Sequence, residues 1–276
     1  MVAPSVLIAG AVTWDVFGGE RRAGGAVSYA ARAAAALGVR ARILTIAGGD
    51  ASIDAFDGHE VHVIASEATL TFEHQVYGEH RRLRVLARPE RALAATDLPR
   101  GWLGASMGVA ILGPLLADDL DVRSLTGVGF ERVGLLGQGL QRTVGDDGVV
   151  EEAVAPSSTL FNVLSDRCSL FLSEDECLSW PTGELARVVE ASERVVVTRG
   201  SAGAEVLRPG QAAERIEPTP AEAVDTTGAG DVFSTAFFLG VTVLGLEVAA
   251  AGALASRLAA AKVGVVGAAA LPRMQG

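Results

Sequence analysis

A glycine-rich turn followed by an aspartate stands before a long apolar run in the last third of the chain. The segment reads AVDTTGAGDVFSTAFFLG and covers residues 223–240. If the apolar run is a helix, Asp231 lies in its first turn, where backbone N–H groups lack intrahelical acceptors and the macrodipole is positive. Such a helix start binds anions, and glycines let a ligand approach the backbone closely. The pattern predicts an anion site that holds a base, with an ordinary helix cap as the alternative.

Length and composition favour one large α/β domain that binds a small molecule. The 276 residues include 49% hydrophobic side chains, which can fill a sizeable core. The formal net charge of −10 argues against nucleic acid or an anionic membrane as the main partner. The N-terminal segment has no basic signal region, and the apolar stretch 232–246 is shorter than the roughly 20 residues that span a membrane. We therefore expect a soluble, cytoplasmic protein.

Short apolar runs alternate with helix-compatible segments along most of the chain. The runs cover residues 6–10, 41–48, 109–113, 133–137, 169–173 and 194–200. Segments such as 26–38 and 183–193 lie between them and are compatible with helices. Uniformly apolar strands that alternate with helices are typical of a parallel sheet covered on both faces.

One segment departs from this rhythm. Residues 69–88 alternate polar and apolar side chains around Gly78, which predicts an exposed antiparallel hairpin. Such a hairpin could cover the strand ends as a lid, and an ordinary edge hairpin is the alternative. Its apolar face is also a candidate surface for pairing with a second copy of the chain. After Asp231 the sequence predicts helices almost throughout.

Two common nucleotide-binding motifs are absent from the sequence. Lys262 is the only lysine and no glycine precedes it, so a P-loop, which needs Gly-Lys-Ser/Thr, is excluded. No G-x-G-x-x-G follows the first apolar run, which leaves a dehydrogenase as a distant alternative.

Several stretches together resemble the ribokinase-like, or PfkB, carbohydrate kinases. Residues 224–238, VDTTGAGDVFSTAFF, are similar to the C-terminal signature of that family. Gly24-Gly25 resembles its N-terminal glycine pair, and residues 195–207 resemble the strand, turn and strand that line its nucleotide site. The start, VLIAGAVTWDVF at 6–17, resembles the first strand and its substrate-binding aspartate. The resemblance spans nearly the whole chain in the expected order.

The resemblance implies one ribokinase-like α/β domain over residues 1–276. Its expected form is a three-layer sandwich with a mostly parallel central sheet and a small β lid, whose segments lie near 13–25 and 69–88. The chain departs from the family pattern at Tyr29, where asparagine is usual, and at Ser173, which replaces the asparagine of an Asn-x-x-Glu motif.

The resemblance also implies a role for each site residue. Asp231 would be the general base, and the N–H groups of Gly228, Ala229 and Gly230 would form the anion hole for the transferred phosphoryl group. The substrate would meet Asp15, through two hydroxyl groups on its two oxygens, and Gly24, Gly25 and Tyr29. The nucleotide would meet Thr198, Gly200, Gly203 and Thr226. Glu176 would act on a magnesium ion through water, and Asp225 and Thr227 resemble a monovalent-cation loop.

These implications lead to one expected function and one competing class. We expect an ATP-dependent phosphotransferase that acts on a hydroxyl of a sugar, cyclitol or nucleoside, with magnesium and a monovalent cation such as K⁺. The competing class is a non-catalytic sugar- or nucleotide-binding regulatory protein on the same fold. Asp231 argues against that class, because a pure binder gains nothing from a carboxylate beside a phosphate.

Overall fold

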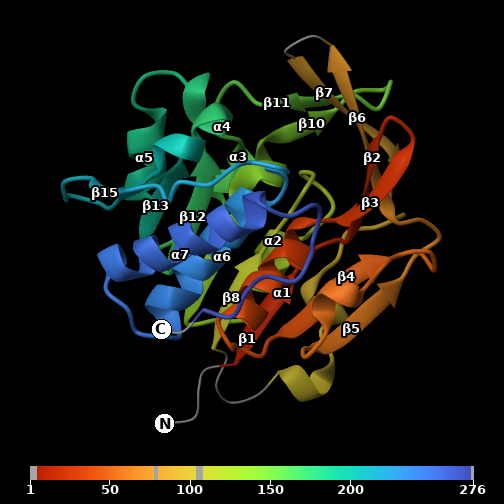
Figure 1. The fold of residues 1–276 in the computed structure, drawn as a ribbon, viewed down its shortest axis with the longest axis horizontal. Helices are drawn as coiled ribbons and strands as arrows, with labels where there is room; N and C mark the ends of the chain where they lie inside the picture. The colour runs from red at the N-terminus through yellow and green to blue at the C-terminus, as the bar shows by residue number, and fades with distance from the viewer. Residues whose placement is uncertain (1–4, 78–79, 104–107, 275–276) are drawn as a thin grey trace.

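A mostly parallel sheet forms the centre of the molecule (Figure 1). The structure, a computed structural model, describes residues 5–77, 80–103 and 108–274. Within these residues the central sheet has nine strands in the order β15-β14-β13-β12-β9-β8-β1-β4-β5. Their bounds are β1 Val6–Ala9, β4 Arg42–Ala47, β5 Glu60–Ala65, β8 Val109–Leu112, β9 Arg132–Leu136, β12 Cys168–Ser173, β13 Arg194–Thr198, β14 Ala204–Leu207 and β15 Glu214–Ile216.

The pairing of the strands follows from their apolar sequences. The strands from β5 to β13 pair in parallel, and β14 and β15 join one edge in antiparallel fashion. Strands such as VLIA in β1 and VAIL in β8 are buried at every position, as expected for strands covered on both faces. All six strands predicted from apolar runs are confirmed, while β5 lies outside those runs because its side chains alternate in exposure.

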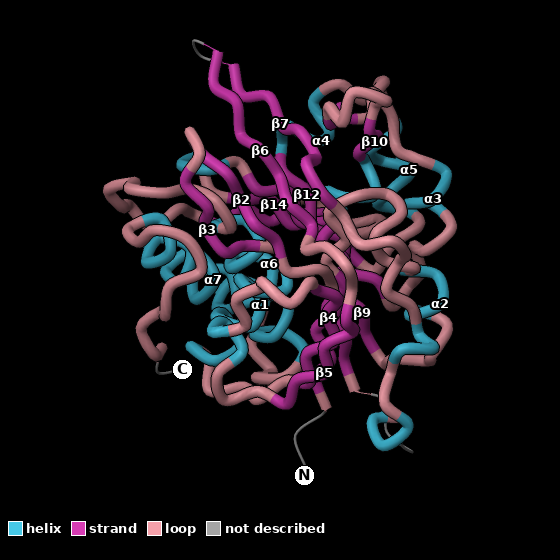
Figure 2. The backbone as a smooth tube through the Cα atoms, turned by 90° about the vertical axis from the view of Figure 1, so that its right-hand side faces the viewer, coloured by secondary structure: helices cyan, strands magenta, loops and turns pink. Residues whose placement is uncertain are grey.

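Helices cover both faces of the sheet (Figure 2). One layer holds α1 (Ala26–Ala36), α6 (Ala229–Thr242) and α7 (Val248–Val263), and α6 contacts both other helices. The other layer holds shorter helices: α2 Val122–Thr126, α3 Ser158–Phe161, α4 Glu174–Leu178 and α5 Glu184–Glu190. The three-layer α/β architecture expected from the resemblance is therefore confirmed. Among the described helices, none combines the length and hydropathy that crossing a bilayer requires.

A second, four-stranded sheet has the order β3-β2-β6-β7 and holds most of segments 13–25 and 69–88. Its strands are β2 Thr13–Phe17, β3 Glu20–Gly24, β6 Leu70–Tyr77 and β7 His80–Ala87. β2 follows directly on the carboxyl end of β1, and β6 follows on that of β5, so this sheet begins where the parallel strands end. The predicted antiparallel pairing of β6 with β7 is confirmed, and its turn at Gly78 lies outside the described residues. A small antiparallel pair, β10 (Arg142–Val144) with β11 (Val150–Glu152), lies nearby.

The apolar side of this hairpin is covered within the chain itself. Leu83 and Val85 of β7 pack against the main core, whereas Arg82 and Arg84 are exposed. Leu86 of the same strand is 50% exposed, and pairing of this hairpin with a second copy of the chain stays a prediction.

Candidate active site

The start of α6 places the predicted base at the carboxyl edge of the sheet. Gly228 caps the helix with φ +76°, a left-handed conformation that glycine adopts at little cost. A Cβ at this position would lie 2.4 Å from the ring of Tyr29, so the ring of α1 packs directly on the glycine. Asp231 follows in the first turn, ahead of the buried run Val232–Gly240 that anchors α6 in the core.

The helix start offers backbone donors, although not the full predicted set. The N–H of Ala229 already donates to the carbonyl oxygen of Thr226, at 3.2 Å. Within the described residues, no acceptor is found for the N–H groups of Gly228, Gly230 or Asp231. Donors without acceptors at a helix start, next to the positive end of its dipole, form an anion site. The predicted anion hole of Gly228, Ala229 and Gly230 thus has its Ala229 N–H already engaged, while the N–H groups of Gly228, Gly230 and Asp231 are the available donors in the described part of the chain.

Asp231 has an unusual protonation equilibrium for an aspartate. Burial raises its pKa to about 7, and the negative charges of Glu176 and Asp15 act in the same direction. The guanidinium of Arg142 opposes the shift. A carboxyl group with a pKa near neutrality is suited to proton transfer, because it can both accept a proton and return it.

Asp15 lies on β2 and is held from two sides. Its Oδ1 is 3.0 Å from Nε2 of His74, and its Oδ2 accepts a hydrogen bond from the Thr13 hydroxyl at 3.5 Å. The His74 ring in turn stacks on Phe17, with ring centroids 4.3 Å apart. Gly24 on the neighbouring strand leaves room for the carboxylate, since a Cβ there would lie 2.2 Å from Oδ2. The close approach of Asp15 thus explains why position 24, the first of the predicted glycine pair, is a glycine.

Tyr29 lies among the acidic groups of the site. The side chain is 3% exposed and belongs to the first turns of α1, which begins after Gly25. Burial raises the pKa of its phenol well above the usual value, and the charges of Asp15, Asp231 and Asp225 add to the shift. The tyrosine therefore stays neutral and remains a hydrogen-bond donor near Asp15 and Asp231.

Glu176 is buried at the start of α4, where it forms a capping box with Ser173. Its Oε2 accepts from the N–H of Ser173 at 3.0 Å, and its own N–H donates to the Ser173 hydroxyl at 3.3 Å. Burial raises the pKa of the carboxyl group, and the N–H of Ser173 and the charge of Arg142 oppose this. No group of three or more acidic, histidine or cysteine side chains that could hold a metal occurs among the described residues. One carboxylate oxygen of Glu176 is used in the capping box, and its water-mediated role toward magnesium stays a prediction.

The predicted nucleotide residues border this region. Thr198 ends β13, is in register with Ser173 and donates to the Leu172 carbonyl at 3.4 Å. Gly200 begins a short turn with φ +50°. Gly203 has φ +90°, and a Cβ there would lie 2.1 Å from the carbonyl oxygen of Ile216, so the local backbone requires glycine, while its nucleotide contact stays a prediction. Thr226 is exposed beside the α6 start.

The predicted monovalent-cation loop is already contacted by a positively charged side chain, that of Lys262. Asp225 Oδ1 accepts from the N–H of Thr227 at 2.9 Å, and Oδ2 accepts from the N–H of Gly267 at 2.8 Å. Lys262 extends from the end of α7 and donates to the main-chain carbonyl of Asp225 at 3.0 Å. Burial acts to raise the pKa of Asp225, but these N–H donors and the Lys262 charge outweigh it and lower the pKa. Lys262 is therefore the cation that the structure places at this loop.

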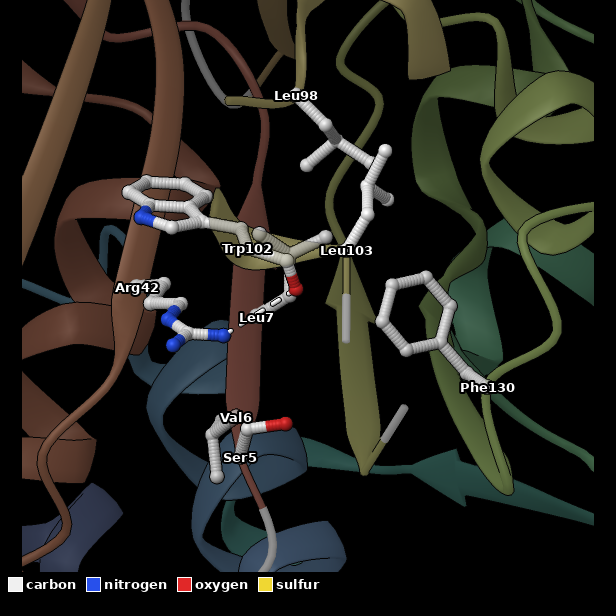
Figure 3. A pocket seen from close by; sticks show the side chains of 8 residues that line it. All are labelled: Ser5, Val6, Leu7, Arg42, Leu98, Trp102, Leu103 and Phe130. Carbon is white, nitrogen blue, oxygen red and sulfur yellow. Dashed lines mark hydrogen bonds between the residues drawn. The ribbon is translucent and has the colours of Figure 1, made fainter. Parts of the chain in front are cut away.

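Two hollows elsewhere in the molecule do not contain the predicted residues. Figure 3 shows one near the amino ends of β1 and β8, where Arg42 donates to the carbonyl of Trp102 at 3.3 Å. Its volume of about 10 Å³ leaves room for at most one water molecule. The other, of about 280 Å³, lies beside the four-stranded sheet and is lined by Arg21, Asp50 and Thr69 among others.

Three residues of the site were missed by sequence reasoning. His74 could have been suspected from its place on the polar side of the predicted hairpin, but not its pairing with Asp15. Arg142 follows a few residues after the carboxyl end of β9, a position where parallel sheets present functional groups. Lys262 is the single lysine in a chain of 276 residues, which is the one sequence signal that sets it apart.

The fold and the site together define a ribokinase-like α/β protein with a carboxylate at an anion-binding helix start. Residues 170–274 match the model of the pfkB family carbohydrate kinase. A ribokinase from Lactococcus lactis subsp. lactis is 39% identical over 72 residues, which span 25% of this chain and 24% of that protein.

Solved structures resemble the chain over nearly its whole length. A pyrophosphate-dependent kinase in the ribokinase family superposes with a TM-score of 0.76 at 16% identity, covering 98% of this chain and 97% of the other. A Burkholderia thailandensis nucleoside kinase in complex with inosine gives 0.73 at 20%, with 98% and 95% covered. Arabidopsis thaliana ribokinase complexed with ribose and ATP gives 0.72 at 18%, with 98% and 96% covered. The chain therefore has the ribokinase-like fold.

Proposed function

We propose that this protein is a kinase that transfers a phosphoryl group to a hydroxyl of a small polyhydroxylated compound, a sugar, cyclitol or nucleoside. The observation that carries the proposal is the position of Asp231, whose pKa of about 7 occurs beside unused N–H donors at the start of α6. A structural cap needs neither feature. A base and an adjacent anion site are the two parts that phosphoryl transfer to an alcohol requires.

Each residue has a separate role in the proposed reaction. Asp15, oriented by His74, accepts hydrogen bonds from acceptor hydroxyls and sets the position of the reactive one. Asp231 takes the proton of that hydroxyl as the oxygen attacks the terminal phosphorus of the donor. The bond from this phosphorus to the bridging oxygen breaks, and the rest of the donor leaves as ADP, or as phosphate when the donor is pyrophosphate. The N–H groups at the start of α6 and the guanidinium of Arg142 stabilise the negative charge on the transferred group. When bound, a magnesium ion would further neutralise the donor phosphates, and Glu176 would orient its water.

ATP is our proposed donor, and Thr198, Gly200 and Thr226 are its proposed neighbours. The resemblance to Arabidopsis thaliana ribokinase complexed with ATP supports this choice. The similar fold of a pyrophosphate-dependent kinase makes inorganic pyrophosphate the second donor to test.

The test is a matrix of donors and acceptors with purified protein and magnesium. ATP and pyrophosphate are each combined with a panel of sugars, cyclitols and nucleosides, and phosphorylated acceptor is measured directly. We expect one acceptor class to be phosphorylated by the wild type and not by Asp231→Asn. The proposal fails if no pair yields product.

The competing function is a sugar- or nucleotide-binding regulatory protein. Tyr29, in place of the usual asparagine, and Ser173 are the residues that favour it. Calorimetry separates the two functions, because a regulatory binder would bind acceptor or nucleotide tightly while the same sample forms no product.

A further inference from the structure

The only lysine of the chain is buried against oxygen atoms. Lys262 is 1% exposed at the end of α7, and its Nζ lies 3.0 Å from the carbonyl oxygens of both Asp225 and Val265. The carboxylate Oδ2 of Asp225 is 3.9 Å away, and the centroid of the Tyr29 ring is 5.7 Å away on another side. Lysine is almost never fully buried without a partner, because its desolvation is costly. The structure meets this need with two carbonyls, a carboxylate and an aromatic face.

These acceptors are of the kind that bind hard cations. Main-chain carbonyls and carboxylates are the oxygen ligands of alkali and alkaline-earth ions in proteins. Here the same oxygens are occupied by an ammonium group that is covalently fixed to the chain. A metal ion at this position would compete for the carbonyls of Asp225 and Val265 and would meet a like charge at short range in a buried place.

The ammonium is connected to the anion site through the loop that it holds. Asp225 ties this loop to the segment after α7, through the N–H of Gly267 and through its own N–H bond to the Val263 carbonyl at 3.0 Å. The loop continues to Gly228, the cap of α6, which packs on the same Tyr29 ring that faces Lys262. Lys262 therefore fixes the backbone of the loop that leads from Asp225 to Gly228, where the N–H donors of α6 begin.

We propose that the Lys262 ammonium is the built-in cation of the 225–228 loop and replaces the monovalent metal ion implied by the family resemblance. The loop then needs no K⁺ or Na⁺ to order. The corollary that phosphoryl transfer is independent of monovalent metal ions rests on the proposed function, whereas the ordering of the loop does not.

The first test measures thermal unfolding in K⁺, Na⁺ or choline chloride at equal ionic strength. We expect the wild-type Tm to be the same in all three salts. Lys262→Ala opens space beside bare oxygens, so its Tm should fall by roughly 5–15 °C in choline and recover partly in K⁺ or ammonium. Lys262→Met removes the charge but fills the space, and its Tm should fall without recovery. Arg257→Ala, an exposed cation on the same helix, is the matched control and should show no salt specificity.

The second test does not require a stable variant. Because Lys262 is the only lysine, selective labelling with ¹³Cε,¹⁵Nζ-lysine gives one NMR signal in the full-length wild type. We expect a charged ammonium whose ζ protons exchange slowly and whose shifts do not respond to K⁺. A rapidly exchanging signal, or a wild-type Tm that rises specifically with K⁺, would overturn the proposal.

The activity corollary is tested with the acceptor found in the matrix above. Wild-type turnover should be equal in K⁺ and choline, and Lys262→Ala should lose at least about tenfold in choline and regain activity in K⁺ or ammonium. Wild-type turnover that increases with K⁺ contradicts the corollary. If no acceptor is found, only the proposed function fails, and the melting and NMR measurements still decide the role of Lys262.

Discussion

At the scale of single residues, the site is an arrangement of carboxyl groups with different partners. Asp15 is paired with His74, Asp225 with backbone N–H groups and Lys262, and Glu176 with the start of α4. Asp231 has the weakest compensation of the four, and its pKa is raised to about 7 by burial and by its acidic neighbours. The four carboxyl groups therefore differ in their readiness to accept a proton, and Asp231 is the one suited to do so.

The first prediction concerns the pH dependence of turnover. A general base must be ionised, so kcat/KM should rise with pH and level off above an apparent pKa of about 7. Asp231→Asn should lower kcat by roughly 100-fold or more and abolish this rise. Initial rates across the pH range, with acceptor at saturating and at low concentration, give the measurement. A wild-type profile that is flat through neutrality contradicts the assignment.

The second prediction concerns stability. Asp231→Asn should lower turnover but should raise the free energy of unfolding. The pKa of Asp231 is higher in the folded protein than in the unfolded chain, so ionisation above neutrality opposes folding. Asp231→Asn removes that penalty, and its gain in unfolding free energy should be on the order of 2 kcal/mol larger at about pH 8.5 than at about pH 5.5. Denaturant unfolding at both pH values measures it. An equal change at both would show that the folded-state pKa is not raised.

The third prediction separates positioning from catalysis at His74. His74→Phe keeps a ring that can stack on Phe17 but removes the nitrogen that contacts Asp15. We expect the acceptor KM to rise by roughly tenfold, as for the loss of one hydrogen bond to a charged group, with a smaller change in kcat. Steady-state kinetics measure the two constants, and the Tm of the variant serves as the control for folding. Unchanged kinetics would assign the pair a purely structural role.

At the scale of elements, the site is made by the starts of α1 and α6 meeting at the ends of the parallel strands. Tyr29 of α1 packs against Gly228 of α6, and this contact sets where the unused N–H groups point. The strands supply the other side: β2 carries Asp15, and β12 leads into Ser173 and Glu176. Asp231 and Glu176 thus lie at helix starts, where backbone groups are free to bind ligands, whereas Asp15 lies within β2.

The fourth prediction compares two glycines of the same turn. Gly228→Ala meets both a left-handed φ of +76° and the Tyr29 ring, so it should destabilise the fold by roughly 2 kcal/mol or more and lower turnover. Gly230→Ala meets no atom within 4 Å and should hold or improve stability, because alanine favours helices by about 1 kcal/mol over glycine. Thermal unfolding of both variants measures the difference. Equal destabilisation would show that packing on Tyr29 does not matter.

At the scale of the whole molecule, charge governs what the protein can bind. The chain carries a formal net charge of −10. In the proposed reaction, several carboxylates of the site would also lie near a phosphoryl donor that is itself an anion. Arg142 is the cation that opposes the rise in the pKa of both Asp231 and Glu176, and one guanidinium does not balance the donor phosphates and these carboxylates. We therefore expect a divalent cation to arrive with the donor and to relieve this electrostatic repulsion.

The fifth prediction follows from this charge balance. Removal of magnesium with a chelator should abolish turnover and weaken donor binding, while the Tm of the protein without donor should not change, because the described residues contain no metal-binding cluster. Calorimetry of the donor with and without magnesium measures the effect. Donor binding of equal strength without magnesium would contradict the prediction.

Most of the central sheet and part of the site could be predicted from the sequence. Continuous apolar runs with no alternation lead to buried parallel strands, because only such strands are covered on both faces. Asp231 at a helix start follows from the glycines and the apolar run that come before and after it. These are local patterns, and a few neighbouring residues suffice to produce them.

The tertiary structure decided which distant groups meet. His74 reaches Asp15 because β6 pairs with β2 in one register, and a shift of one residue would turn its side chain to the other face. Lys262 reaches the Asp225 loop across 37 positions because α7 returns beside α6. The pKa of Asp231 depends on desolvation and on charges from other elements, so no local pattern contains it. The sequence alone determined the kind of chemistry, and only the packing of its elements decided which charge neutralises which.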